Sequence, residues 1–281
     1  MPSDTDRLGL DPSAAECARL VRASDPDRYF ATLFAPATAR PALFALYAFA
    51  GELAGIRRRV SEPMPGEIRL QWWRDALDDV FAGRTRGAPV ADALARAAVA
   101  HNLPRPPFDA MIDARVFDLY DDFMPTLGDL EGYCGETESA LVQLATITLA
   151  PEAAAQSADA AGHAGVAIGL ARILTAIRAE PWRSAFLPRD LREKHGVPAS
   201  GSTNTAAYSA AVSALAEAGI KHVAEARRGL AALDRAVLPG FLPLAPAELD
   251  LKRLARRADR APAPHWRRLA ALYWAARRGL A

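Results

Sequence analysis

The sequence predicts an all-α protein that forms a single domain over residues 1–281. Apolar residues recur at spacings of three and four along almost the whole chain, which is the period of a helix with one buried face. No segment alternates β-branched and polar residues as a half-buried strand does. Because 51% of the 281 residues are hydrophobic, the chain is long and apolar enough to bury one large core.

Proline, glycine and capping residues indicate where the helices begin and end. Asp11 followed by Pro12 is typical of an N-cap and a first helical position, and predicts a helix to about Ser24. A short helix is expected within "SAFLPRDLREKHGVPASGST", and two helices follow the proline-rich "LPGFLPLAPAE". The other helices are expected from "FAPATARP" through Arg59 and at about 66–82, 90–100, 105–124, 127–150, 152–180 and 201–237.

Composition excludes several classes of protein. The formal net charge is only +1, which gives no electrostatic reason to expect a nucleic-acid partner. Cys17 and Cys134 are too few for a disulfide framework or a thiolate metal site, and indicate a reducing compartment. The N-terminal segment resembles neither a secretory signal nor a transit peptide, and apolar runs are shorter than a membrane span. We therefore expect a cytoplasmic protein.

Two acidic clusters share the spacing DxxDD: Asp75, Asp78 and Asp79, and then Asp118, Asp121 and Asp122. On a helix this spacing brings carboxylates to one face, where they could bind a divalent cation. However, a helical wheel places Asp75, Asp79, Asp118 and Asp122 opposite the apolar faces of their helices. We therefore favour solvated, salt-bridged surfaces over metal sites for both clusters.

Other catalytic motifs are not apparent. The five histidines lack an HxxxH or HExxH spacing, and no glycine-rich phosphate loop or nucleophile elbow occurs. Trp72 and Trp73 are adjacent on an expected helix, and we interpret them as packing residues, with Trp73 on the core face.

Six segments occur in an informative order: "DRYFATLFAP", "ALFALYAFAGELAGI", "RLQWWRDAL", "LEGYC", "GLARILTAI" and "FLPRDL". Together they resemble the squalene and phytoene synthase family over roughly Asp27 to Val197. The resemblance implies an isoprenoid-synthase-like helical bundle around a central cavity. In active members, two aspartate-rich motifs on facing helices coordinate magnesium ions, which hold the diphosphate of prenyl substrates.

Both motifs are degenerate in this chain. The first is represented by "GELAGIRRR", so its aspartate positions are Ala54, Gly55 and Arg58. The second is represented by "RILTAIRAEPWRSAFLP", in which Arg172 and Ala176 occupy motif positions and Glu180 is the nearest carboxylate. Positive charge at Arg58 would oppose a cation there by Coulomb repulsion. The resemblance therefore implies a pseudoenzyme without a metal site or other cofactor.

One branch of this family, the eukaryotic respiratory complex I assembly factor 6, is similar in lacking these aspartates and in its "ELA", "VSE" and shortened "LRAxP" segments. The similarity implies a bacterial, non-catalytic assembly or scaffold protein whose partners are respiratory complex subunits or another protein. The alternative is an active head-to-head prenyltransferase that condenses prenyl diphosphates and requires Mg²⁺. It would need Asp75 or Asp118 turned inward, or arginines that clamp the diphosphate.

Two binding hypotheses complete these expectations. A retained cavity would hold a lipid or isoprenoid, with Arg57, Arg58, Arg172 and Arg178 as candidate anion contacts, unless these arginines are solvated or paired with glutamates such as Glu52 and Glu62. The basic C-terminal stretch "LKRLARRADRAPAPHWRRLAALYWAARRGLA" either docks as a helix by its apolar side or contacts the inner membrane peripherally.

Overall fold

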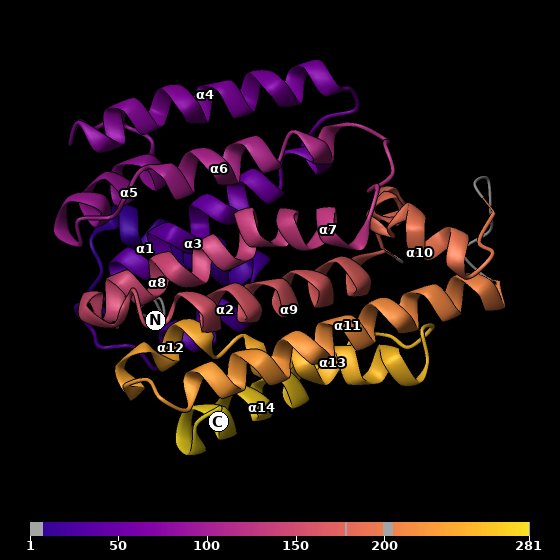
Figure 1. Ribbon diagram of the computed structural model, residues 1–281. Coiled ribbons are helices and arrows are strands. Elements are labelled where there is room, and N and C mark those ends of the chain that lie inside the picture. The colour runs from indigo at the N-terminus through magenta and orange to yellow at the C-terminus, as the bar shows by residue number, and fades with distance from the viewer. Residues whose placement is uncertain (1–7, 178, 199–204, 281) are drawn as a thin grey trace.

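The computed structural model describes residues 8–177, 179–198 and 205–280, and these ranges contain helices and no strands (Figure 1). The α-helices are α1 (Pro12–Ser24), α2 (Pro26–Thr32), α3 (Arg40–Ala54), α4 (Pro63–Phe81), α5 (Pro89–Ala100), α6 (Pro106–Ala114), α7 (Leu127–Cys134), α8 (Ala140–Leu149), α9 (Ala158–Ala176), α10 (Arg189–Lys194), α11 (Ala206–Leu230), α12 (Leu238–Phe241), α13 (Leu244–Arg256) and α14 (His265–Arg278). Short 3₁₀ turns connect several of them, and a π-helical turn, Gly135–Ser139, joins α7 to α8. The all-α expectation is confirmed.

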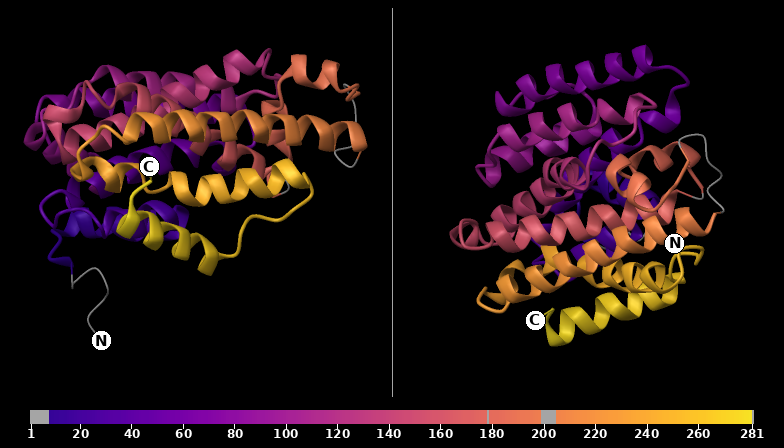
Figure 2. Two further views of the ribbon diagram at one scale, coloured as in Figure 1. Left: turned by 60° about the horizontal axis from the view of Figure 1, so that its bottom comes forward. Right: turned by 45° about the vertical axis from the view of Figure 1, so that its right-hand side comes forward.

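Two groups of helices enclose two hydrophobic clusters. The N-terminal helices α1, α3, α4, α5 and α6 surround one cluster, whose fully buried aromatic residues include Phe44, Phe49 and Phe108. Helices α9, α11 and α13 surround the other, with Phe186 and Phe241 in its interior. Figures 1 and 2 show α8 and α9 between the outer helices of the two groups. Side chains of both clusters therefore meet along the middle of the bundle.

Most expected helices form, and their boundaries follow local chemistry. The first helix has the expected bounds, because Asp11 accepts hydrogen bonds from the backbone N–H groups of Ser13 and Ala14. A second Asp-Pro pair, Asp25-Pro26, begins α2 in the same way, although no helix was predicted there. The helix expected through Arg59 ends at Ala54, and the arginine run forms a separate 3₁₀ turn.

The expectation of a continuous helix over 105–124 is wrong. Helix α6 ends at Ala114, a 3₁₀ turn covers Phe117–Leu119, and the chain is then not helical until α7. Tertiary hydrogen bonds replace helical ones in this segment: Met124 N–H donates to the Ala185 carbonyl at 2.8 Å, and Arg189 N–H donates to the Met124 carbonyl at 2.9 Å. Long-range pairing of this kind overrides local helical periodicity.

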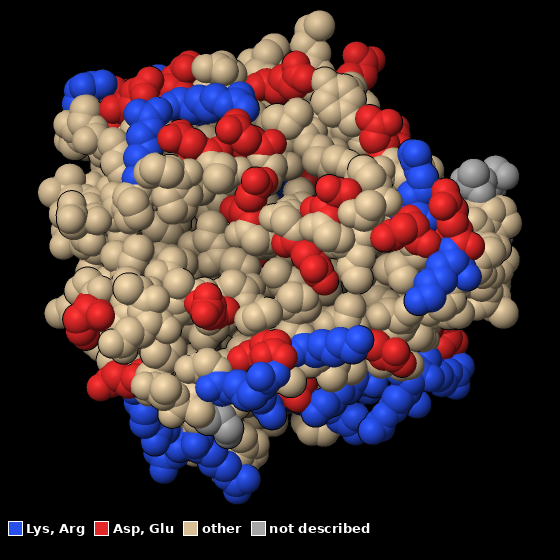
Figure 3. Space-filling model, viewed as in Figure 1, with Lys and Arg blue, Asp and Glu red and all other residues tan. Residues whose placement is uncertain are grey.

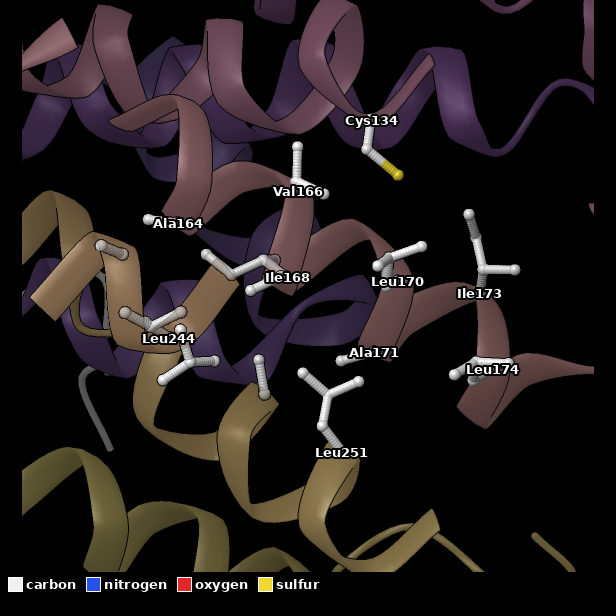
Figure 4. Packing of buried hydrophobic residues seen from close by; sticks show 14 of the residues in the cluster. Cys134, Ala164, Val166, Ile168, Leu170, Ala171, Ile173, Leu174, Leu244 and Leu251 are labelled. Carbon is white, nitrogen blue, oxygen red and sulfur yellow. The ribbon is translucent and has the colours of Figure 1, made fainter. Parts of the chain in front are cut away.

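Helix α9 passes very close to the π-helical turn. A Cβ atom on Gly165 would lie 2.2 Å from both the Cα and the backbone nitrogen of Ser139, so the two backbones can approach only because Gly165 has no side chain. One turn further on, Gly169 faces the Cys134 side chain in the same manner. Figure 4 shows Cys134 beside this part of α9, with Leu244 and Leu251 of α13 on the other side. These contacts bring the turn up against α9.

Helix α9 also contacts α11 through a polar pair within the apolar interface. His163 Nδ1 and His222 Nδ1 lie 2.8 Å apart, and the Nε2 of His222 lies 3.2 Å from Glu131 of α7. A hydrogen bond across the pair requires one ring nitrogen to donate and the other to accept.

Among the described residues, no helix combines the length and apolar character needed to cross a bilayer.

We predict that Gly165→Ala lowers the free energy of unfolding by about 3 kcal/mol, because the added methyl group meets backbone that cannot rotate away. Gly162→Ala on the same helix is the control, since its Cβ would meet nothing within 4 Å. It should be neutral or stabilising by up to about 1 kcal/mol through helix propensity. Urea unfolding of both variants measures the difference, and equal effects would contradict this packing.

Candidate functional site

A cavity of about 110 Å³ lies where the two hydrophobic clusters meet. Its wall combines α3, the turn between α1 and α2, α7 with the π-helical turn, and α9, and it is rich in charged groups. The charged lining residues are Asp25, Arg28, Arg58, Arg115, Glu138, Arg172 and Arg183, and the others include Tyr47, Gly51, Ala54, Tyr133, Cys134 and Ile173. The volume is below that of an apolar cavity that holds one benzene molecule, about 150 Å³.

Two carboxylates and two guanidinium groups form a closed ring of ion pairs in this wall. Arg28 donates to Glu138 Oε2 at 2.6 Å and lies 3.3 Å from Asp25 Oδ2. Arg172 donates to Asp25, and its Nε lies 3.8 Å from Glu138 Oε2. Arg28 and Glu138 are buried, and the Arg28 guanidinium stacks over the Tyr47 ring at 5.1 Å. Each charge therefore has partners of opposite sign on two sides.

A second buried group joins Arg115, Asp118 and Tyr133. Arg115 donates to Asp118 at 3.1 Å and to the Tyr133 hydroxyl at 2.7 Å, and that hydroxyl donates to the other Asp118 oxygen at 2.6 Å. Only 3% of Asp118 is exposed, so the prediction that it faces solvent is wrong. Because α6 ends before this residue, a helical wheel gives the wrong direction, and the carboxylate turns inward behind two residues that line the cavity.

The degenerate positions of the first motif lie on or beside this cavity. Ala54 and Arg58 line it together with Tyr47 and Gly51, whereas Gly55 is buried next to the Arg59 side chain. The Arg58 side chain is 48% exposed and donates from Nη1 to Glu180 at 3.0 Å. This ion pair joins the segment after α3 to the segment after α9.

The positions of the second motif divide between the ring and this ion pair. Arg172 belongs to the ring, and Ala176 is half-buried near the end of α9. Glu180 accepts hydrogen bonds from Arg58 and, at 2.7 Å, from Arg183. The fold thus brings residues of both motifs to the cavity. There Arg58 of the first motif pairs with Glu180 of the second.

The remaining candidate residues lie near the rim. Arg57 contacts the exposed Asp121 at 3.4 Å and stacks over Trp182, and Arg59 pairs with Glu52 at 3.0 Å. Arg178 lies outside the described residues. The cluster of Asp75, Asp78 and Asp79 is on the surface of α4, where Arg105 pairs with Asp78 and Arg84 with Asp79. The preference for a salt-bridged surface there agrees with the structure.

The arginines determine the protonation of the ring. Burial raises the pKa values of Asp25 and Glu138, but the guanidinium groups of Arg172 and Arg28 outweigh this effect, so the pKa of each carboxyl lies below its ordinary value. Burial raises the pKa of Tyr47 to about 12 and that of Tyr133 well above the ordinary value. At neutral pH the carboxyls of Asp25 and Glu138 are therefore ionised, and both phenols keep their protons.

A magnesium ion does not fit this donor set. Mg²⁺ requires carboxylate oxygens in near-octahedral geometry, whereas Asp25 and Glu138 already accept hydrogen bonds from arginines. Two unit positive charges 4 Å apart repel by roughly 4 kcal/mol at an effective dielectric constant of 20, and a divalent ion would face several arginines. Among the described residues, no group of three or more His, Cys, Asp or Glu residues is arranged to hold a metal.

Sequence reasoning missed the ring itself. The segment "DRYF" contains Arg28, and "LEGYC" contains Tyr133, but both were used only as marks of resemblance. Glu138 and Asp25 were not identified. No local signal marks them as buried, because Asp25 lies among the polar residues of "RASDPDR" and Glu138 among those of "GETES".

Comparison with known proteins identifies relatives of this chain. The family model for squalene/phytoene synthase matches residues 21–274. The chain is 36% identical over 194 residues to a Bos taurus protein, NADH dehydrogenase (ubiquinone) complex I, assembly factor 6; the match covers 68% of this chain and 57% of that protein. It is 26% identical over 189 residues to a phytoene synthase of Rhodobacter capsulatus, with 64% and 53% covered. The chain thus spans little more than half the length of these relatives.

Solved structures of this family have a similar fold. The crystal structure of squalene synthase HpnC from Alicyclobacillus acidocaldarius superposes with a TM-score of 0.72 at 20% identity, and covers 89% of this chain and 97% of that one. The bundle is therefore of the isoprenoid-synthase type. With the family model matched over nearly the full length, the chain belongs to the squalene/phytoene synthase family.

We predict that Glu138→Ala lowers the free energy of unfolding by about 3 kcal/mol, because it removes the closest partner of the buried Arg28. Glu136→Ala, two residues away in the same turn and exposed, is the control and should change stability by less than about 0.5 kcal/mol. Guanidinium unfolding measures both. Equal losses would show that the ring contributes nothing beyond the turn itself.

The lowered pKa values of Asp25 and Glu138 also predict acid sensitivity. Because the unfolded chain takes up protons near the ordinary values of 3.8 and 4.5, this stabilisation is complete above pH 5 and is lost as the pH falls toward the folded values. Unfolding free energies measured between pH 7 and pH 3 should fall less steeply for Glu138→Gln than for wild type. Glu136→Gln should retain the wild-type slope; an unchanged slope for Glu138→Gln would contradict the assignment.

Proposed function

We propose that this chain is a non-catalytic member of the squalene/phytoene synthase family that acts as an assembly factor for a respiratory NADH dehydrogenase. The observation that carries the proposal is the ion pair between Arg58 and Glu180, together with the ring that includes Arg172. These residues occupy the segments that the family resemblance assigns to metal and diphosphate binding. The similarity to complex I assembly factor 6 supports the choice of partner.

The charge distribution supports the loss of prenyltransferase chemistry. Departure of an allylic diphosphate leaves negative charge that a catalyst must stabilise, and hard cations on carboxylates usually do so. Here the buried carboxylates stabilise arginines instead, and freeing them would leave guanidinium groups unpaired. Asp118 faces inward, as the prenyltransferase alternative requires, but both its oxygens are bonded to Arg115 and Tyr133.

An activity assay tests the non-catalytic part. Purified protein is incubated with farnesyl or geranylgeranyl diphosphate and Mg²⁺, and released diphosphate and extracted hydrocarbon are measured. The phytoene synthase of Rhodobacter capsulatus serves as the positive control. We expect no turnover above a no-protein blank. Turnover that Glu138→Ala abolishes, and that Glu136→Ala leaves intact, would overturn the proposal.

A deletion of the gene in the source organism tests the partner. We expect less assembled NADH dehydrogenase on native gels and slower NADH oxidation by membranes, both restored by the wild-type gene. Arg58→Ala should also restore them, because a half-exposed ion pair contributes at most about 1 kcal/mol to folding. The deletion strain carrying an empty vector is the negative control. Normal assembly in the deletion strain would contradict the assembly role.

A second candidate function is the binding of an isoprenoid or lipid phosphate at the cavity. It is favoured by the excess of positive charge, since five arginines line the cavity beside two carboxylates. At about 110 Å³ the space suits the phosphate group of such a ligand, so a prenyl or lipid tail would lie outside it. Thermal stabilisation by a non-hydrolysable farnesyl diphosphate analogue tests it: a shift in the presence of chelator supports binding by arginine, a shift only with Mg²⁺ supports the enzyme, and no shift removes this candidate.

A further inference from the structure

The outward face of α14 carries an unusual set of exposed side chains. Trp266 is 65% exposed, Tyr273 48% and Trp274 51%. The exposed arginines of the same helix are Arg267, Arg277 and Arg278. Arg267 stacks on Trp266 at 5.1 Å and Arg278 on Trp274 at 4.5 Å, so cations and rings lie against each other on this surface. Several exposed aromatic rings on one helix face, unlike a single scattered one, indicate a surface that binds a partner.

Buried contacts fix the rotation of α14 and therefore decide which face is outward. Arg268 points inward, where its Nε lies 3.1 Å from Asp27 of α2 and its Nη1 donates to Asp250 of α13. Leu272 and Ala275 are buried on the same side. Figures 1 and 2 show α14 at the edge of the bundle, packed by one side only. The exposed aromatic and basic residues thus form one continuous face.

The basic surface extends from α14 to the end of α13 and the segment that follows it. No acidic residue occurs between His265 and Ala281, and the neighbouring stretch from Lys252 to Arg260 carries four arginines and one lysine beside a single aspartate. Figure 3 shows Lys and Arg gathered along the lower edge of the molecule, over α13 and α14, whereas acidic side chains are common on the rest of that view. The molecule is nearly neutral overall, so its positive charge is concentrated on one side.

We propose that the outward face of α14 binds the surface of an anionic lipid bilayer. Trp and Tyr rings have an apolar body and a polar edge that suit the headgroup region, and arginine extends its stem along apolar surface while its guanidinium reaches phosphate oxygens. The basic surface surrounds one partly apolar helix and extends past α14 to the arginines of α13. A planar anionic membrane is broad enough to contact all of it. This inference is independent of the cavity and of the assembly role.

The expected strength follows from the charges. Each basic residue close to an anionic membrane increases partitioning by roughly fivefold, so the three exposed arginines of α14 together contribute on the order of 100-fold. Removal of two of them should weaken binding by on the order of 25-fold. The attraction is screened by salt, because the Debye length shortens to about 3 Å at 1 M.

Co-sedimentation with vesicles tests the proposal. The full chain is mixed with vesicles of phosphatidylcholine containing 30% phosphatidylglycerol, a composition of roughly the charge of an anionic leaflet, and with pure phosphatidylcholine vesicles. We expect salt-sensitive binding to the anionic vesicles only. Arg277→Ala with Arg278→Ala, and separately Trp266→Ala with Trp274→Ala, should lose most of it. The matched control is Arg69→Ala with Trp72→Ala on α4, where Trp72 is 40% exposed; it should bind as wild type.

Thermal melting of each variant confirms that it is folded before binding is compared. Equal binding to neutral vesicles, no binding to either, or losses for the α4 control that match those for α14 would each overturn the proposal. So would an α14 variant that binds vesicles normally but no longer associates with solubilised NADH dehydrogenase, since that outcome assigns the face to a protein partner.

Discussion

The close approach of α9 to the π-helical turn determines the chemistry of the interior. Gly165 and Gly169 allow the π-helical turn to lie against α9. This position places Glu138 of the turn between Arg28 and Arg172. Without that contact, Glu138 would have no reason to be buried, and the two arginines would lose a shared counter-ion. A backbone constraint at two glycines thus supports an electrostatic network that connects α2, α9 and the turn.

The network supplies both signs of charge at the cavity from the polypeptide itself. In a metal-dependent arrangement, positive charge from the ion and negative charge from the substrate complete the site. Here both signs belong to the polypeptide, so the charges of the ring balance one another within the protein. Such internal compensation holds the segments that carry the ring in one arrangement, because breaking any pair would leave a buried charge without a partner.

Sequence reasoning predicted the elements well and the side-chain partners poorly. Helical periodicity and Asp-Pro capping gave the helix order, because both act within a few residues. The partners of Arg58, Arg172 and Asp118 depend on distant segments: Glu180 lies 122 positions from Arg58, and Asp25 lies 147 from Arg172. The inward turn of Asp118 depends on where α6 ends, which is decided by tertiary hydrogen bonds and not by local pattern.

The ion pair between Arg58 and Glu180 restricts which side chains position 58 can carry. A single change of Arg58 to aspartate would remove a positive charge from the first motif and set a carboxylate beside Glu180, with only Arg183 left to balance the two. The two carboxylates would repel each other unless a cation lay between them. A carboxylate at position 58 would therefore need further substitutions around Glu180 before both side chains could be accommodated.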